Sequence, residues 1–158
     1  MNNFECDREI KDKVIEYFRR KSEPKYTLQL DTDNNNNKYA TADIKFDLIN
    51  KKTGKKTTYE IEIKERTGST YDDYNDIMFE TDKLDYLLKE HNKGVKTYFL
   101  NVFNDKADAI LFPIDDNLKF SAGFSYQYKY TEKQCNKKQL MLKLYIKKKY
   151  GKRINLNG

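Results

Sequence analysis

The spacing of apolar residues along the chain predicts two helices. In residues 4–21, Ile10, Val14 and Phe18 recur at every fourth position among charged residues, which is the period of an amphipathic helix. Residues 76–91 carry a second apolar set with helical spacing and are soon followed by a glycine, a common residue just after a helix end. We therefore expect one helix near the start of the chain and one near its middle.

Alternation of apolar and polar residues predicts the strands. In residues 39–49, Ile44, Phe46 and Leu48 would share one face of a strand, and the charged residues between them would share the other face. Residues 140–146 fit either a helix or a strand, but their period of two favours a strand. In all, strands are expected at residues 25–31, 39–49, 57–66, 95–103, 107–114, 124–131 and 140–146.

The order of these elements indicates the fold class. It reads α-β-β-β-α-β-β followed by further strands, without an internal repeat or a linker. Helices interspersed among strands are typical of a layered α/β domain. We expect a single domain over residues 1–158, in which a central mixed β-sheet is flanked by helices.

The composition excludes several classes of protein. Charged residues make up 35% of the chain, but 13 Tyr and 9 Phe can form a core that leans on aromatic rings. No apolar run approaches the roughly 18 residues that a membrane helix needs, and the first residues lack the apolar region of a secretion signal. We therefore expect a cytoplasmic location without membrane contact. The bias toward Asn, Lys and Tyr is typical of an AT-rich genome such as that of a virus, for which the location would be the host cytoplasm.

Few side chains are available for thiol or imidazole chemistry. Cys6 and Cys135 form no CxxC pair, and His91 is the only histidine. A disulfide framework, a zinc site and a histidine-based catalytic triad are therefore not expected. Any reaction would have to use carboxylates, lysines, tyrosines and a bound ion.

Positive charge is concentrated in one segment near the C-terminus. Residues 133–153 contain nine bases and no acids, although the whole chain has 31 bases against 25 acids, so acids outnumber bases elsewhere. A basic segment on a mildly acidic body indicates a polyanionic partner, and we expect Lys147, Lys148 and Lys149 to contact the backbone of nucleic acid. The alternative is a solvated lysine-rich segment without a partner.

Two neighbouring strands place acids and a lysine on one face. In the stretch YEIEIKER, residues 59–66, two acids and then two bases alternate along the polar face. If Thr53-Gly54 forms a two-residue turn, then Asp43 on the preceding strand faces Lys64. Opposed residues lie about 5 Å apart and share a face of the sheet. Asp43, Glu62 and Lys64 would then converge on one patch.

This patch has the chemistry of a metal site. Two carboxylates at such spacing can share one divalent ion, and oxygen ligands with retained waters suit Mg²⁺ or Mn²⁺. A lysine beside them can orient a metal-bound water or neutralise charge on a phosphate. The alternative is a pair of ordinary cross-strand contacts, Lys45 with Glu62 and Asp43 with Lys64, on the wet face of a hairpin. A register slip of one residue would move Asp43 to the opposite face.

The arrangement resembles the PD-(D/E)xK nuclease superfamily, which has the restriction-endonuclease-like fold. The matching residues are Asp43 in TADIKF and Glu62-Ile63-Lys64 in YEIEIKER, while Ala42 stands where the family's proline would be. The resemblance implies that Asp43, Glu62 and the Ile63 carbonyl bind the metal. It also implies that Lys64 assists the attacking water.

Two further positions follow from the same resemblance. Members often have an acid on the first helix that reaches the metal through water, and either Asp7 or Glu9 is a candidate here. An ordinary acidic first turn of a helix is the alternative. Members also often have a basic residue on the helix after the E-x-K strand, which would be Lys83. A solvated ion pair between Lys83 and Glu80 is the alternative for that position.

The sequence therefore predicts a metal-dependent nuclease that hydrolyses phosphodiester bonds, with DNA as the expected substrate. Asp43, Glu62 and Lys64 would be its catalytic residues, and Mg²⁺ or Mn²⁺ its cofactor. The basic residues named above, Lys83 and Lys147 to Lys149, would hold the backbone. A homodimer is expected if both strands are cut. The rival functions are a non-catalytic module of the same fold that binds nucleic acid or protein, and a basic assembly protein.

Overall fold

The computed structural model describes residues 3–32, 42–66, 68–128 and 138–158. The elements in chain order are α1 (Asn3–Ser22), β1 (Tyr26–Leu30), β2 (Ile44–Asn50), β3 (Lys56–Glu65), the 3-10 turn η1 (Tyr71–Asp73), β4 (Asp76–Glu80), α3 (Thr81–Asn92), β5 (Lys96–Val102), β6 (Asp108–Pro113), β7 (Ser121–Tyr128), β8 (Lys138–Lys147), the 3-10 turn η2 (Lys148–Tyr150) and β9 (Lys152–Asn155).

Nine strands form two sheets within the described residues. Six of them make a mixed sheet in the order β1-β2-β3-β5-β6-β9, and three make an antiparallel sheet in the order β4-β8-β7. In the larger sheet only β3 and β5 run parallel, and α3 lies in the connection between them. The predicted α/β class with a mixed sheet and two helices is confirmed.

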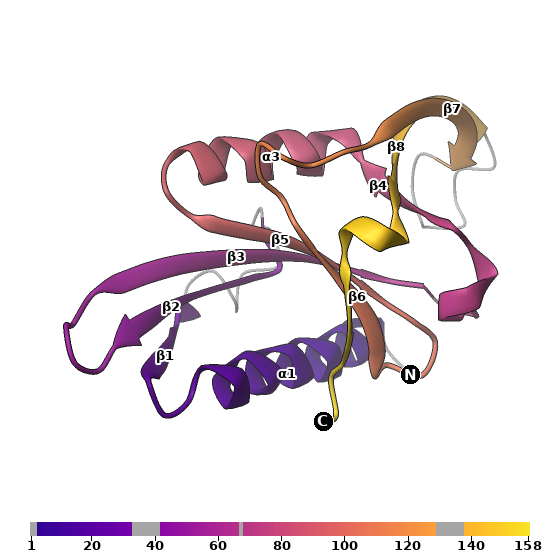
Figure 1. Cartoon of the computed structure of the whole chain (residues 1–158). Coiled ribbons are helices and arrows are strands. Elements are labelled where there is room, and N and C mark those ends of the chain that lie inside the picture. Colours follow the sequence, from indigo (N-terminus) through magenta and orange to yellow (C-terminus); the bar gives the residue numbers. More distant parts are fainter. Residues whose placement is uncertain (1–2, 33–41, 67, 129–137) are drawn as a thin grey trace.

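The larger sheet lies between two layers. Figure 1 shows α1 on one side of this sheet and α3 on the other. The core under α1 joins the helix to β2, β3, β5, β6 and the C-terminal strand. Its buried members are Ile10, Val14, Tyr17, Ile44, Phe46, Leu48, Ile61, Leu100, Val102, Ala109, Ile154 and Leu156.

The opposite core joins α3 and the smaller sheet to β5 and β6 of the larger sheet. Phe79 on β4 and Phe99 on β5 stack with ring centroids 4.1 Å apart, which connects the two sheets. The buried members are Ile77, Phe79, Leu84, Leu87, Phe99, Phe103, Ile110, Phe112, Ile114, Leu144 and Ile146. Four of them are phenylalanines, in keeping with the predicted aromatic core. Neither described helix is long and apolar enough to cross a membrane.

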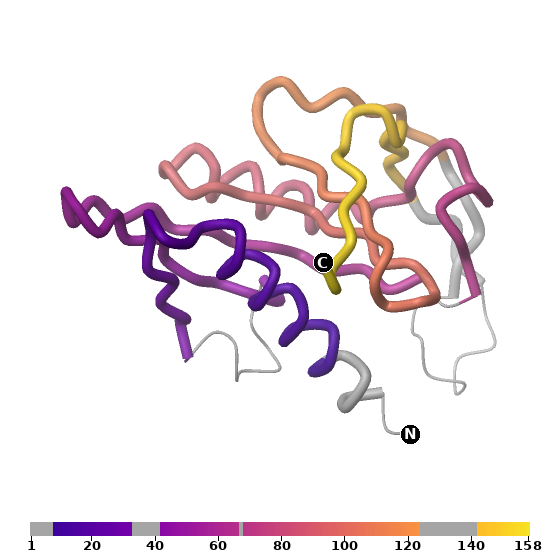
Figure 2. The backbone as a smooth tube through the Cα atoms, turned by 60° about the horizontal axis from the view of Figure 1, so that its bottom comes forward, coloured from indigo at the N-terminus to yellow at the C-terminus, as the bar shows by residue number. Residues whose placement is uncertain are grey.

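The basic segment is built into both sheets rather than forming a solvated tail. Its residues in β8 pair with β4 and β7, and those in β9 pair with β6. The chain then ends beside α1 (Figure 2), where the Arg20 guanidinium donates a hydrogen bond to the Leu156 carbonyl oxygen at 3.1 Å. The segment therefore has a structural role in addition to its charge.

One helix boundary was predicted wrongly. The helix expected over residues 76–91 begins at Thr81, and Asp76–Glu80 forms β4 instead. Ile77 and Phe79 pair with Ile146 and Leu144 of β8 and become buried. Local periodicity could not reveal this strand, because its partner lies almost seventy residues further along the chain. The last strand, β9, was not predicted at all.

Candidate functional site

The β2–β3 hairpin has a longer turn than the sequence suggested. Asn50 and Lys55 close the loop with a hydrogen bond from the Asn50 amide to the Lys55 carbonyl oxygen at 2.9 Å. The Asn50 side-chain oxygen accepts hydrogen bonds from the amides of Lys52 and Thr53. Gly54 completes the turn with φ of 71°, a conformation that favours glycine. The expected two-residue turn at Thr53-Gly54 is therefore wrong.

The longer loop shifts the register of the hairpin by two residues. Lys45 faces Glu60, and Asp47 faces Thr58, so the predicted pairs of Lys45 with Glu62 and of Asp43 with Lys64 are wrong. Because side chains in a strand alternate with a period of two, this shift leaves every residue on its predicted face. Continuing the observed register would place Asp43 opposite Glu62.

Asp43 lies just before β2 and is tied directly to the neighbouring strand. Its Oδ2 accepts a hydrogen bond from the backbone N–H of Ile63 at 2.7 Å. This contact holds the carboxylate beside Glu62, the residue next to Ile63 on β3. The structure thus brings together the two acids that the sequence predicted as a pair.

Glu62 is a buried acid with one close cation. Burial, followed by the negative charge of Asp43, raises the pKa of Glu62 to about 7. The Lys83 ammonium lies 3.2 Å from Glu62 Oε1. Burial acts to lower the pKa of Lys83, but the charges of Glu62 and Asp43 outweigh it and raise that pKa. Asp43, Glu62 and Lys83 therefore form one electrostatic group, the Asp43–Glu62 site.

Packing of α3 explains why Glu60 and Glu62 on this face of the hairpin are buried from solvent. Leu84 and Leu87 are buried in the core beside Phe99, which fixes the first turns of the helix over the sheet. The Tyr86 hydroxyl donates a hydrogen bond to Glu60 Oε1 at 3.0 Å. Glu60 is only 1% exposed, and burial raises its pKa.

Glu60 has a second contact and one unsatisfied atom. The Lys45 ammonium lies 3.6 Å from Glu60 Oε1. Glu60 Oε2 is buried without a hydrogen-bond partner among the described residues. A cross-strand pair of acid and lysine is therefore present, as the alternative expected, but it joins Lys45 to Glu60 and its acid is buried rather than solvated.

The two bases that end YEIEIKER have different surroundings. Lys64 is exposed and makes no ion pair with a described residue. Arg66 is partly buried and donates two hydrogen bonds. Its Nε donates one to the Oδ1 of Asn101 at 2.9 Å, and its Nη2 donates the other to the carbonyl oxygen of Met78. Burial lowers the pKa of Arg66. Arg66 is therefore fixed in place, whereas Lys64 projects into solvent.

Asn101 and Tyr86 were missed by the sequence analysis. Asn101 is fully buried on β5, and its position inside the apolar stretch VKTYFLNVF was the only available signal. An amide in such a strand must find polar partners within the protein. No comparable signal marked Tyr86, since one tyrosine on an amphipathic helix is ordinary.

The donor set at the Asp43–Glu62 site fits a hard divalent cation. Within the described residues, no three His, Cys, Asp or Glu side chains gather closely enough to hold a metal. Two carboxylates and a backbone carbonyl with several waters are sufficient for Mg²⁺, which retains water ligands. The N–H and carbonyl of a strand residue face the same neighbour, so the Ile63 carbonyl oxygen points to the side on which Asp43 lies.

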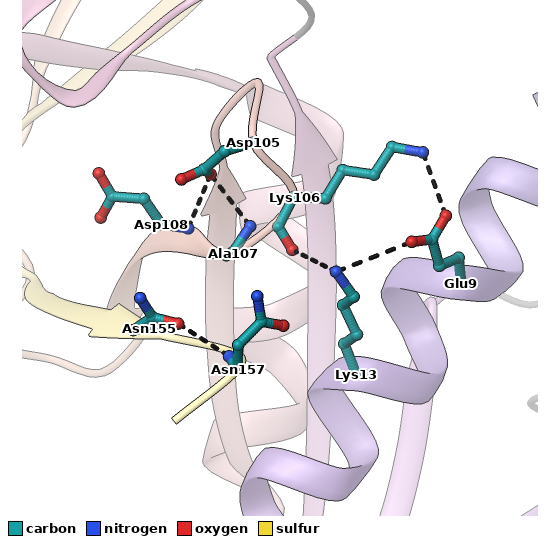
Figure 3. A network of polar contacts seen from close by, with 8 residues as sticks. All are labelled: Glu9, Lys13, Asp105, Lys106, Ala107, Asp108, Asn155 and Asn157. Atoms are coloured by element: carbon teal, nitrogen blue, oxygen red, sulfur yellow. Dashed lines mark hydrogen bonds and ion pairs between the residues drawn. The ribbon is translucent and has the colours of Figure 1, made fainter.

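Of the two candidate acids of the first helix, the structure places Glu9 away from this site. Glu9 forms ion pairs with Lys106 at 3.2 Å and with Lys13 at 3.7 Å, in a network near the β5–β6 turn (Figure 3). These cations lower the pKa of Glu9. The side chain of Asp7 lies outside the described part of the chain. The predicted role of an N-terminal acid therefore stays a prediction.

The three lysines expected to hold nucleic acid differ in their contacts. Lys148 donates a hydrogen bond to the carbonyl oxygen of Tyr71, and its ammonium lies 3.9 Å from the Tyr71 ring centroid. Arg153 lies 3.9 Å from the same ring and is also hydrogen-bonded to Asp108. Lys147 and Lys149 are exposed. Lys148 therefore serves at least to fasten the loop after β3.

Comparisons with protein-family models, with curated proteins and with solved structures gave no match for this chain.

Proposed function

We propose that this chain is a metal-dependent nuclease of the PD-(D/E)xK type, which hydrolyses phosphodiester bonds of nucleic acid, with DNA as the substrate. The restriction-endonuclease-like core belongs to the same proposal. Asp43, Glu62 and the Ile63 carbonyl would bind Mg²⁺ or Mn²⁺. Lys64 and Lys83 would supply positive charge at the reacting phosphate.

The observation that carries the proposal is the contact between Asp43 and β3. Asp43, just before β2, accepts a hydrogen bond from the Ile63 amide, and this contact holds the Asp43 carboxylate beside the buried Glu62. Two acids held next to each other repel, and here that repulsion contributes to the raised pKa of Glu62. A divalent cation between them would relieve it, so the arrangement favours metal binding.

The topology supports the same proposal. A helix, an antiparallel meander of three strands, a crossover helix and a strand parallel to the third occur in this order along the chain, with η1 and β4 inserted before the crossover helix. This is the order expected from the resemblance to restriction-endonuclease-like nucleases. The E-x-K strand, β3, is internal to the sheet, with β2 and β5 on either side.

Each residue of the site has a distinct task in the proposed reaction. A bound divalent ion would polarise the phosphate and lower the pKa of an attacking water. Asp43 and Glu62 hold the ion, and the Ile63 amide fixes the orientation of Asp43. Lys83, on the first turn of α3, balances the charge of Glu62, and the exposed Lys64 can reach a phosphate entering from solvent.

One observation favours the second candidate, a non-catalytic module of the same fold that binds nucleic acid or protein. The Lys83 ammonium already lies 3.2 Å from Glu62 and partly balances the charge that a metal would balance. If that ion pair is permanent, the acids stabilise the fold and bind no ion. Metal binding distinguishes the two candidates.

A nicking assay on supercoiled plasmid tests the proposal. Wild type is compared with Asp43→Asn, Lys64→Met and Lys83→Met in Mg²⁺, in Mn²⁺ and in EDTA. The side-chain oxygen of asparagine can still accept the hydrogen bond from the Ile63 amide, so Asp43→Asn should fold normally. We expect metal-dependent nicking by wild type, none by Asp43→Asn, and reduced nicking by the two lysine variants.

Asp47→Asn is the matched control, because Asp47 lies on β2 four residues after Asp43 but contacts Thr58 and Lys56 instead. It should nick like wild type. Electron paramagnetic resonance of Mn²⁺ measures binding independently of cleavage. Absence of Mn²⁺ binding by wild type would reject the metal site and leave the non-catalytic candidate.

A further inference from the structure

A second surface joins an exposed aromatic ring with two lysines and lies outside the Asp43–Glu62 site. It is formed by Lys119, Lys149 and Tyr150 and is called the Tyr150 surface below. Tyr150 is 38% exposed. The ammonium groups of Lys149 and Lys119 lie 5.2 Å and 5.8 Å from the centroid of the Tyr150 ring.

Two segments that are distant in the sequence meet at this surface. Lys119 lies two residues before β7, whereas Lys149 and Tyr150 belong to η2, which follows β8. The antiparallel pairing of β7 with β8 brings these segments together, with Ser121 opposite Tyr145. The surface is therefore a product of the folded chain and not of one lysine-rich run.

The turn that carries Tyr150 is fixed to the body of the protein. The Lys148 amide donates to the carbonyl oxygen of Asn75 at 3.2 Å, and the Gly151 amide donates to that of Lys148 at 3.0 Å. Gly151 also packs closely against Ile110 and Phe112 of β6. Tyr150 is thus an exposed ring on a held backbone, which lowers the entropy lost when a ligand binds.

An exposed ring beside ammonium groups matches the chemistry of unpaired nucleotides. Every base has a π-face that can stack on an aromatic side chain, and every linkage carries a negative phosphate. Stacking of a base is generally stronger than a cation–π contact at an exposed site, so a base can displace a lysine from the ring. The displaced ammonium then remains close enough to pair with a phosphate. Bases within a duplex stack on each other and cannot take this position.

We propose that the Tyr150 surface binds single-stranded nucleic acid. One unpaired base stacks on the Tyr150 ring, while Lys119 and Lys149 pair with the neighbouring phosphates. This binding needs neither a metal nor the Asp43–Glu62 site, so it is independent of the proposed cleavage.

Fluorescence anisotropy in EDTA tests the proposal without interference from cleavage. The probes are labelled oligothymidylate and oligouridylate of about 12 nucleotides, within the usual site sizes of single-strand binding proteins, and a DNA duplex of the same length. The variants are Tyr150→Leu, Tyr150→Phe and the double variant of Lys119→Gln with Lys149→Gln. Tyr74→Leu is the control, because Tyr74 is 60% exposed but belongs to another loop.

We expect wild type to bind a single strand more tightly than the duplex. Tyr150→Leu should weaken single-strand binding by about 5- to 100-fold, and Tyr150→Phe should restore it because the ring is retained. The double lysine variant should reduce the salt dependence of binding, by about 0.7 in the logarithmic slope for each lost phosphate contact. Comparison of the two single strands separates DNA from RNA as the partner.

Three results would overturn the proposal. The first is that Tyr150→Leu binds the single strands as tightly as wild type does, and the second is that this variant loses equal affinity for the single strands and for the duplex. The third is that wild type binds neither single strand at about 50 mM salt, where backbone contacts are strong. A protein that nicks plasmid normally but gives any of these results would retain the proposed nuclease function. A protein that fails to nick but behaves as expected here would retain the Tyr150 surface.

Discussion

Replacing Glu62 by glutamine should change how the stability of the protein depends on pH. Burial and the charge of Asp43 raise the pKa of Glu62 from its ordinary value of 4.5 to about 7. The folded protein therefore holds the proton of Glu62 more tightly than the unfolded chain does. For such a group, the stabilising contribution is complete below pH 4.5 and is lost as pH rises through about 7.

The size of the effect follows from the two pKa values. One pKa unit corresponds to about 1.4 kcal/mol, so the contribution lost between pH 4.5 and a pH well above 7 is about 3 kcal/mol. Glutamine cannot ionise, so Glu62→Gln should not show this pH-dependent loss of unfolding free energy. Since Lys83 also lies within the influence of Asp43, its charge remains partly balanced in the variant.

The assay is urea denaturation of wild type and Glu62→Gln at several values between about pH 5 and about pH 8, in EDTA to remove metal ions. The informative quantity is how the difference in unfolding free energy changes with pH, because a constant effect of the substitution on packing cancels. We expect Glu62→Gln to gain up to about 3 kcal/mol relative to wild type across this range. For a chain of this size, that corresponds to about 6 to 12 °C in Tm.

Glu16→Gln is the matched control. It removes one negative charge from an exposed position on α1, where Glu16 pairs with Arg19 at 2.9 Å. Its stability should follow wild type at every pH within a few tenths of a kcal/mol. If Glu62→Gln shows the same pH dependence as this control, Glu62 is not a strained acid. The electrostatic argument for the Asp43–Glu62 site would then fail.

Two further substitutions test how the C-terminal segment is held. Tyr71→Leu removes the ring between two cations and should lower the unfolding free energy by about 1–3 kcal/mol, whereas Tyr74→Leu, at an exposed tyrosine in the same loop, should have little effect. Gly151→Ala places a Cβ 2.5–2.7 Å from two buried side chains of β6 and should cost about 1–3 kcal/mol, whereas Gly158→Ala meets open space and should be neutral. Thermal melts of the four variants test both predictions. Equal Tm values for Tyr71→Leu and Tyr74→Leu, or for Gly151→Ala and Gly158→Ala, would show that the corresponding contact does not stabilise the protein.

The sequence analysis located the polar pair more reliably than it located the hairpin turn. The turn at Thr53-Gly54 was wrong, because a side chain three residues upstream, Asn50, organises a longer loop. The error moved the register by two residues. An even shift leaves each side chain on the same face, so Asp43 and Glu62 still meet.

The role of the lysines could not be read from the pattern. By spacing, Lys64 was expected beside the acids, yet it is exposed, and Lys83 from α3 lies on Glu62 instead. The position of Lys83 depends on how α3 packs against Phe99, which is a contact between distant parts of the chain. The same packing buries Glu60 and Glu62, although the alternation of apolar and polar residues along this strand had suggested that they would be exposed to solvent.

The sequence by itself therefore determined most of the elements and the face on which each strand residue lies, because the periods of two and 3.6 are properties of the local backbone. Tertiary structure alone decided the hairpin register, the pairing of Asp76–Glu80 with β8, and the burial of the two glutamates under α3. These depend on loop closure and on packing between segments far apart in the chain. Their free energies are therefore absent from any single stretch of sequence. This is why the strand pattern predicted the two acids of the site, whereas Lys83 was named only from the resemblance and its contact with Glu62 was not predicted.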